Sequence, residues 1–114
     1  MRLNHLNLTV SFLPAAVEFL EKYFGMRKLG GSAGLTVLQD CGGFVLTLMK
    51  KGRNDAFMYP ENFQIGFFLE SEEKVNELNR RLKEDVFDPP PLQRPHTWTF
   101  YVDAPGGFTV EVGA

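Results

Sequence analysis

The sequence contains a single cysteine, Cys41, among 114 residues, so no disulfide can form within one chain. Disulfides belong to oxidising compartments, and a chain without one is expected in a reducing compartment. The start of the chain shows no apolar stretch typical of a secretion signal, and no apolar run approaches the ~20 residues that span a membrane. These absences predict a cytoplasmic protein with no membrane segment.

An excess of positive charge is also absent, because 12 Lys and Arg face 14 Asp and Glu for a formal net charge of −2. Nucleic-acid binding normally requires a clustered basic excess, so that function class is excluded. Hydrophobic residues, by contrast, make up 44% of the chain and include 11 Phe. This composition indicates a globular protein with a roomy apolar core or pocket.

The pattern of apolar residues predicts similar elements in both halves of the chain. In the first half, residues 3–10 alternate as a strand, a helix follows, and two strands are expected at 35–38 and 44–49. In the second half a helix again follows the first strand. The three strands expected there are 63–69, 97–102 and 108–112.

Each predicted helix has a serine near its start and an apolar stripe along one face. The stripes recur at i, i+3 and i+7, which places their members on one side of a helix. A glycine-containing turn is expected after the first helix. The residues are Ser11 and Ser71 as N-caps, Val17, Leu20 and Phe24 for the first stripe, Val75, Leu78 and Leu82 for the second, Gly25 as the first helix stop, and Gly30, Gly31 and Gly34 for the turn.

A short repeated sequence supports an internal duplication. The segment 42–47 begins Gly-Gly-Phe, and 106–111 begins in the same way 64 residues further along the chain. Each half alone would leave a sheet face uncovered, so the two halves are expected to pack as a pair. The sequence therefore predicts one domain over residues 1–114, made of a module at 1–50, a linker at 51–62 and a second module at 63–114.

Polar residues on the first and last strands of the halves form the candidate site. The apolar members of these strands must face the helix, which leaves His5, Gln64 and Glu111 on the opposite face, with Thr47 in the fourth equivalent position. An imidazole, an amide oxygen and a carboxylate can bind a divalent ion such as Mn²⁺, Fe²⁺, Ni²⁺ or Zn²⁺. Each residue also has an ordinary interpretation as a polar strand residue.

Polar and aromatic residues of the predicted strands supply candidates for a substrate pocket. The aromatic members can either stack on a ligand or pack in the core. His96 follows a proline and is interpreted as a surface loop residue that could reach the mouth of a pocket. The pocket candidates are Asn7, Thr47, Phe68, Trp98 and Tyr101.

Three segments closely resemble the vicinal oxygen chelate superfamily, which includes glyoxalase I, extradiol dioxygenases, fosfomycin resistance thiol transferases and bleomycin resistance proteins. They are Asn4-His5-Leu6-Asn7-Leu8-Thr9-Val10, the helix from Pro14 to Met26, and the stretch from Phe100 to Val112 with Asp103-Ala104-Pro105-Gly106-Gly107 at its centre. The resemblance implies an α+β fold of two βαβββ modules that form a curved, half-open sheet around a central cavity.

The resemblance also implies metal ligands at His5, Gln64 and Glu111, with Glu111 taking part in catalysis. The ion would act as a Lewis acid on a substrate that chelates it through neighbouring oxygens. In many short members two chains form a homodimer and exchange modules, so the resemblance implies that His5 of one chain could join Gln64 and Glu111 of the other. Three departures from family patterns are present: Thr47 where glyoxalase sites have a carboxylate, Gln64 where several relatives have histidine, and Phe12 where many relatives have a polar helix cap.

Two functions follow from these observations. The first is a divalent-metal-assisted enzyme, of lyase, isomerase, transferase or dioxygenase type, that acts on a small oxygenated substrate. The second is a non-catalytic protein of the bleomycin-resistance type that binds and sequesters a small molecule. The pair His5 and Glu111 favours the enzyme, whereas Thr47 and Gln64 favour the binding protein.

Overall fold

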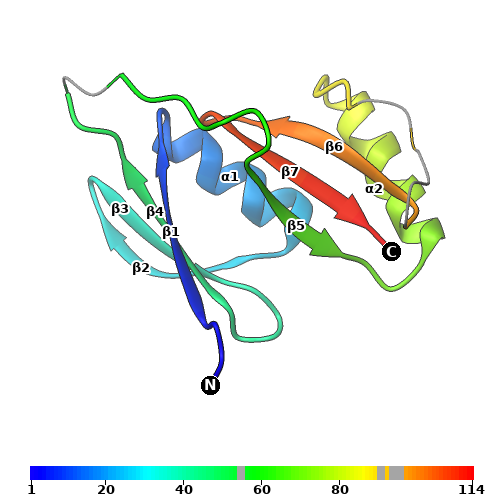
Figure 1. Ribbon diagram of the computed structural model, residues 1–114, viewed down its shortest axis with the longest axis horizontal. Coiled ribbons are helices and arrows are strands. Elements are labelled where there is room, and N and C mark those ends of the chain that lie inside the picture. The colour runs from blue at the N-terminus through cyan, green and yellow to red at the C-terminus, as the bar shows by residue number, and fades with distance from the viewer. Residues whose placement is uncertain (54–55, 90–91, 93–96) are drawn as a thin grey trace. The chain divides into compact units, whose positions relative to one another are not determined.

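The computed structural model describes residues 1–53, 56–89, 92 and 97–114 (Figure 1). Contacts divide the chain into a first unit, Met1–Met58 with Pro105–Gly107, and a second unit, Tyr59–Ala104 with Phe108–Ala114. The elements in chain order are β1 (His5–Val10), α1 (Leu13–Phe24), β2 (Arg27–Ser32), β3 (Leu35–Gln39), β4 (Val45–Lys50), β5 (Gln64–Phe68), α2 (Glu72–Glu84), β6 (Thr99–Ala104) and β7 (Phe108–Gly113).

The first unit contains a four-stranded sheet in the order β1-β4-β3-β2. Strand β1 pairs in parallel with β4, and the other pairs are antiparallel. Leu8 and Val10 are buried on one face of β1, as the alternation predicts, but Leu6 on the same face is 37% exposed, and His5 and Asn7 on the opposite face are exposed. The sheet therefore separates an apolar face from a polar one.

The second unit repeats this plan with a three-stranded sheet in the order β5-β7-β6. Its first strand, β5, also pairs in parallel with its last strand, β7. Asn7 lies opposite Thr47 in the first unit, and Gly66 lies opposite Glu111 in the second. Two mixed, open sheets with two helices confirm the predicted α+β class and are consistent with two βαβββ modules, although the described part of the second unit contains three strands.

Helix α1 begins differently from the sequence prediction. Its N-cap is Phe12 rather than Ser11, and no side chain caps it. The backbone N–H of Ser11 instead donates to the Gly106 carbonyl at 3.0 Å, in the Pro105–Gly107 turn of the same unit. Pro14 lies in the first turn, where its missing N–H has no helical partner to lose. The helix ends as predicted at Gly25, which adopts a φ of 64°.

The buried face of α1 is also rotated from the predicted stripe. Of Val17, Leu20 and Phe24, only Leu20 is fully buried. The Phe19 ring takes an inward position, 5.4 Å from the Tyr23 ring between centroids. Burial of Phe19 removes more apolar area than burial of Val17, which accounts for the rotation. The buried positions are Leu13, Ala16, Phe19, Leu20 and Tyr23.

The expected turn at Gly30 and Gly31 is instead part of strand β2. This strand is exposed along its whole length and pairs with β3 at the edge of the sheet, with a bulge between Lys28 and Gly30. A Cβ atom at Gly31 would collide with the Leu35 carbonyl oxygen. The glycine therefore permits close strand pairing here, which local turn statistics do not anticipate.

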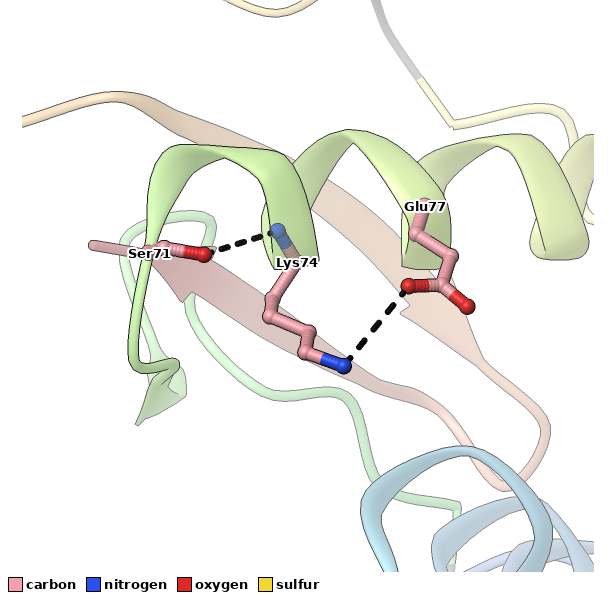
Figure 2. Close-up of polar contacts among 3 residues, drawn as sticks. All are labelled: Ser71, Lys74 and Glu77. Atoms are coloured by element: carbon pink, nitrogen blue, oxygen red, sulfur yellow. Dashed lines mark hydrogen bonds and ion pairs between the residues drawn. The ribbon is translucent and has the colours of Figure 1, made fainter.

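Helix α2 agrees with its prediction. The Ser71 hydroxyl accepts a hydrogen bond from the Lys74 backbone N–H at 3.2 Å, as Figure 2 shows. Val75, Leu78 and Leu82 are buried, so the predicted stripe is confirmed. None of the described helices is long and apolar enough to cross a membrane.

Replacement of Ser71 by alanine is expected to lower the free energy of unfolding by about 1 kcal/mol, because the Lys74 N–H loses its acceptor. Urea unfolding measures this change. Ser71→Asp should retain most of the stability, since its carboxylate can accept the same bond.

The Lys74–Glu77 pair in Figure 2 is 3.9 Å long and more than half exposed. Glu77→Ala should therefore change stability by less than about 0.5 kcal/mol.

Candidate functional site

Three predicted site residues share the exposed face of the first sheet. His5 and Asn7 come from β1, and Thr47 lies opposite Asn7 on β4. The Nδ1 atom of His5 is 2.8 Å from the Asn4 Oδ1 atom. This oxygen can only accept, so the contact suits the His5 tautomer with its ring hydrogen on Nδ1, in which Nε2 keeps the lone pair that binds a metal ion.

Glu111 occupies the centre of the corresponding face in the second unit. It lies on the middle strand β7, opposite Gly66 of β5 on one side and Tyr101 of β6 on the other. Its neighbours Val110 and Val112 are fully buried on the opposite face. The alternation along β7 therefore directs the carboxylate away from the apolar core, as the sequence predicted.

The Glu111 carboxylate has hydrogen-bond contacts on both flanks. The Gln64 Nε2 atom donates to Oε2 at 2.7 Å, so the structure brings these two predicted ligands together. On the other flank, the hydroxyls of Tyr101 and Thr99 each lie 3.4 Å from Oε1. We refer to Gln64, Thr99, Tyr101 and Glu111 as the Glu111 cluster.

The chemistry of the Glu111 cluster fits a divalent cation. A carboxylate offers about four lone-pair positions, and the contacts with Gln64 and Tyr101 leave others for a ligand. The Gln64 side chain uses its nitrogen for Glu111, which leaves its carbonyl oxygen as a donor to an ion. In the described part of the chain no three His, Cys, Asp or Glu side chains gather as a metal site.

The other predicted pocket residues differ in their surroundings. Phe68 ends β5 with 79% of its surface exposed. Trp98 donates its indole N–H to the Asn76 Oδ1 atom of α2 at 2.7 Å. His96 lies outside the described residues. The combination of His5 with Gln64 and Glu111, and the pocket roles of Asn7, Thr47, Phe68, Trp98 and Tyr101, stay predictions.

Sequence reasoning did not select Asn4 or Thr99. Thr99 is a buried polar residue whose hydroxyl donates to the Val112 carbonyl at 2.7 Å. A signal for it exists in the alternation of Thr99, Tyr101 and Asp103 along one strand, since these residues share the face of Glu111. Asn4 lies within the strand predicted at residues 3–10, but in the structure it precedes β1, which begins at His5.

These elements define an α+β protein of two similar modules, each with a sheet and a helix, and with a carboxylate-centred polar cluster in the second. The chain belongs to the Glyoxalase/Bleomycin resistance protein/Dioxygenase superfamily, whose family description matches residues 2–112. A comparison with curated proteins found no match.

Solved structures share this fold. A possible glyoxalase from Bacillus cereus is 50% identical with a TM-score of 0.93, and the alignment covers 100% of this chain and 99% of that one. A lactoylglutathione lyase from Agrobacterium tumefaciens is 20% identical with a TM-score of 0.79, over 98% and 92% of the two chains. A mutant of the fosfomycin resistance protein FosX from Listeria monocytogenes, complexed with Mn(II) and 1S,2S-dihydroxypropylphosphonic acid, is 20% identical with a TM-score of 0.83, over 99% and 91%.

Proposed function

We propose that this protein is a divalent-metal-assisted enzyme that acts on a small oxygenated substrate. Gln64 and Glu111 would hold the ion, and the family resemblance implies His5 as a third ligand. The observation that carries the proposal is the 2.7 Å hydrogen bond between the two side chains, which come from strands 47 residues apart in sequence. A polar pair on the outward face of a sheet, oriented before a ligand arrives, is typical of a binding centre.

Each residue has a defined task in this proposal. The bound ion supplies Lewis acidity toward substrate oxygens. Glu111 provides the negative charge that attracts the cation, and Gln64 restricts the rotation of the carboxylate. The Asn4 contact keeps the His5 Nε2 lone pair available. Asn7 and Thr47, side by side on β1 and β4, offer an amide and a hydroxyl to substrate oxygens.

The superfamily relatives support the metal. The FosX structure contains Mn(II), and that protein shares the fold of this chain. We propose that the bound ion is Mn²⁺, Fe²⁺, Ni²⁺ or Zn²⁺ and that the reaction is of lyase, isomerase, transferase or dioxygenase type. A homodimer, with or without exchanged modules, is likewise a prediction from the family resemblance.

Ion titration tests this function. Chelator-treated protein is titrated with Mn²⁺, Fe²⁺ under anaerobic conditions, Ni²⁺ and Zn²⁺ while thermal unfolding is followed. At least one ion should raise the stability in a saturable manner, by about 2.7 kcal/mol at one hundred times its Kd. His5→Ala should weaken this response. If no ion stabilises the chelator-treated protein, the metal-assisted function is wrong.

A second function is favoured by one observation, the exposed ring of Phe68. An exposed aromatic side chain beside polar groups suits the binding of an apolar or aromatic compound without a metal. In that case aromatic compounds should stabilise the chelator-treated protein, whereas the ions should not. The same thermal assay therefore separates the two functions.

A further inference from the structure

Tyr101 lies directly opposite Glu111 in the sheet of the second unit. The two residues are register partners in the antiparallel pair of β6 and β7. Side chains of such partners share one face, so the half-buried Tyr101 ring lies beside the Glu111 side chain. Its hydroxyl is 3.4 Å from the Glu111 Oε1 atom.

The hydrogens of the Glu111 cluster can be assigned one by one. Thr99 has a single hydroxyl hydrogen, and its 2.7 Å contact with the Val112 carbonyl is far better than its 3.4 Å contact with Glu111. The Thr99 hydrogen therefore belongs to the Val112 carbonyl. The Tyr101 hydroxyl is then the donor to the Oε1 atom, while the Gln64 amide serves Oε2.

These two donors hold the carboxylate from opposite strands. Gln64 approaches from β5 and Tyr101 from β6, so rotation about the last side-chain bond of Glu111 would break both contacts. Gly66 leaves room on the β5 side. A Cβ atom at Gly66 would meet only Glu111 atoms within 4 Å, the nearest being Oε2 at 3.9 Å. The carboxylate is thus oriented beside open space.

We propose that Tyr101 is a positioning residue for Glu111. With Gln64, it fixes the carboxylate plane before an ion arrives, which lowers the entropic cost of ordering a glutamate side chain on binding. This inference rests on the proposed function, because Glu111 is the ligand that Tyr101 orients. It assigns the Tyr101 hydroxyl to the protein's own carboxylate instead of to a substrate.

The test compares Tyr101→Phe with Tyr59→Phe in the chelator-treated full chain. Both changes delete one phenolic hydroxyl in the second unit, and the Tyr59 ring stacks on Phe63 at 4.3 Å, outside the Glu111 cluster. Mn²⁺ affinity is measured by electron paramagnetic resonance of the free ion. The visible spectrum of bound Co²⁺ reports the ligand geometry, and thermal unfolding without ions reports any structural damage.

Tyr101→Phe should weaken Mn²⁺ binding about tenfold, the lower end of the effect of an outer partner of a metal ligand. It should also change the Co²⁺ spectrum and leave the ion-free Tm within about 2 °C. Tyr59→Phe should leave affinity and spectrum unchanged. Equal affinities and spectra for the wild type and Tyr101→Phe would overturn the inference while the proposed function stands. A loss of Mn²⁺ affinity in Tyr101→Phe that Tyr59→Phe matches would do the same. Absence of ion binding by the wild type would instead overturn the proposed function itself.

Discussion

Replacement of Phe100 by alanine is expected to lower the free energy of unfolding by about 3–5 kcal/mol. The Phe100 side chain on β6 is completely buried, opposite the equally buried Val112 on β7. Removal of the ring loses its packing contacts and leaves a cavity that a small shift of the sheet cannot fill. A loss of this size is a large part of the total stability of a small domain.

Phe68→Ala provides the matched control for Phe100→Ala. The two residues are the same type in the same sheet, but Phe68 is 79% exposed. Its replacement should change the free energy of unfolding by less than about 0.5 kcal/mol. Urea unfolding of both variants measures the difference in their free energies of unfolding, provided that the two m-values are equal. Similar losses for the two variants would contradict the assignment of Phe100 to the core and Phe68 to the surface.

Replacement of Glu111 by glutamine is expected to abolish the ion-dependent stabilisation. The neutral amide has nearly the same shape, but it lacks the charge that attracts a cation and offers a weaker donor oxygen. The loss of affinity should exceed the about 10–100-fold that follows loss of an outer partner. Isothermal titration with the ion that stabilises the wild type measures this loss.

Asp103→Asn is the control for the loss of charge. Asp103 shares the outward face of the same sheet and accepts a hydrogen bond from the Thr109 hydroxyl at 3.3 Å, away from the Glu111 carboxylate. The Asp103→Asn substitution removes the same formal charge as Glu111→Gln. If affinity depended only on the general field of the sheet face, both variants would weaken binding alike, and the assignment of Glu111 as a ligand would be wrong. A much larger loss in Glu111→Gln is expected.

The sequence predicted the second helix better than the first. In α2 the capping serine and the stripe of Val75, Leu78 and Leu82 agree with the structure because both signals are local. In α1 the entry is decided by the Pro105–Gly107 turn, whose Gly106 carbonyl binds the Ser11 N–H. Local capping rules contain no information about a partner nearly one hundred residues away. Strand β2 was missed for a similar reason, because its pairing with β3 overrides its glycine content.

The sequence by itself determined that His5, Gln64 and Glu111 lie on the side of their strands opposite the buried Val10, Val110 and Val112 or their equivalents. A two-residue alternation is a property of the extended backbone and needs no knowledge of neighbouring strands. Only the tertiary structure decided which side chains contact the Glu111 carboxylate. Gln64 and Tyr101 reach it because strand order and register place β5 and β6 on either side of β7. Register is fixed by the pairing of whole strands and the packing of one face, so no single segment of sequence encodes it.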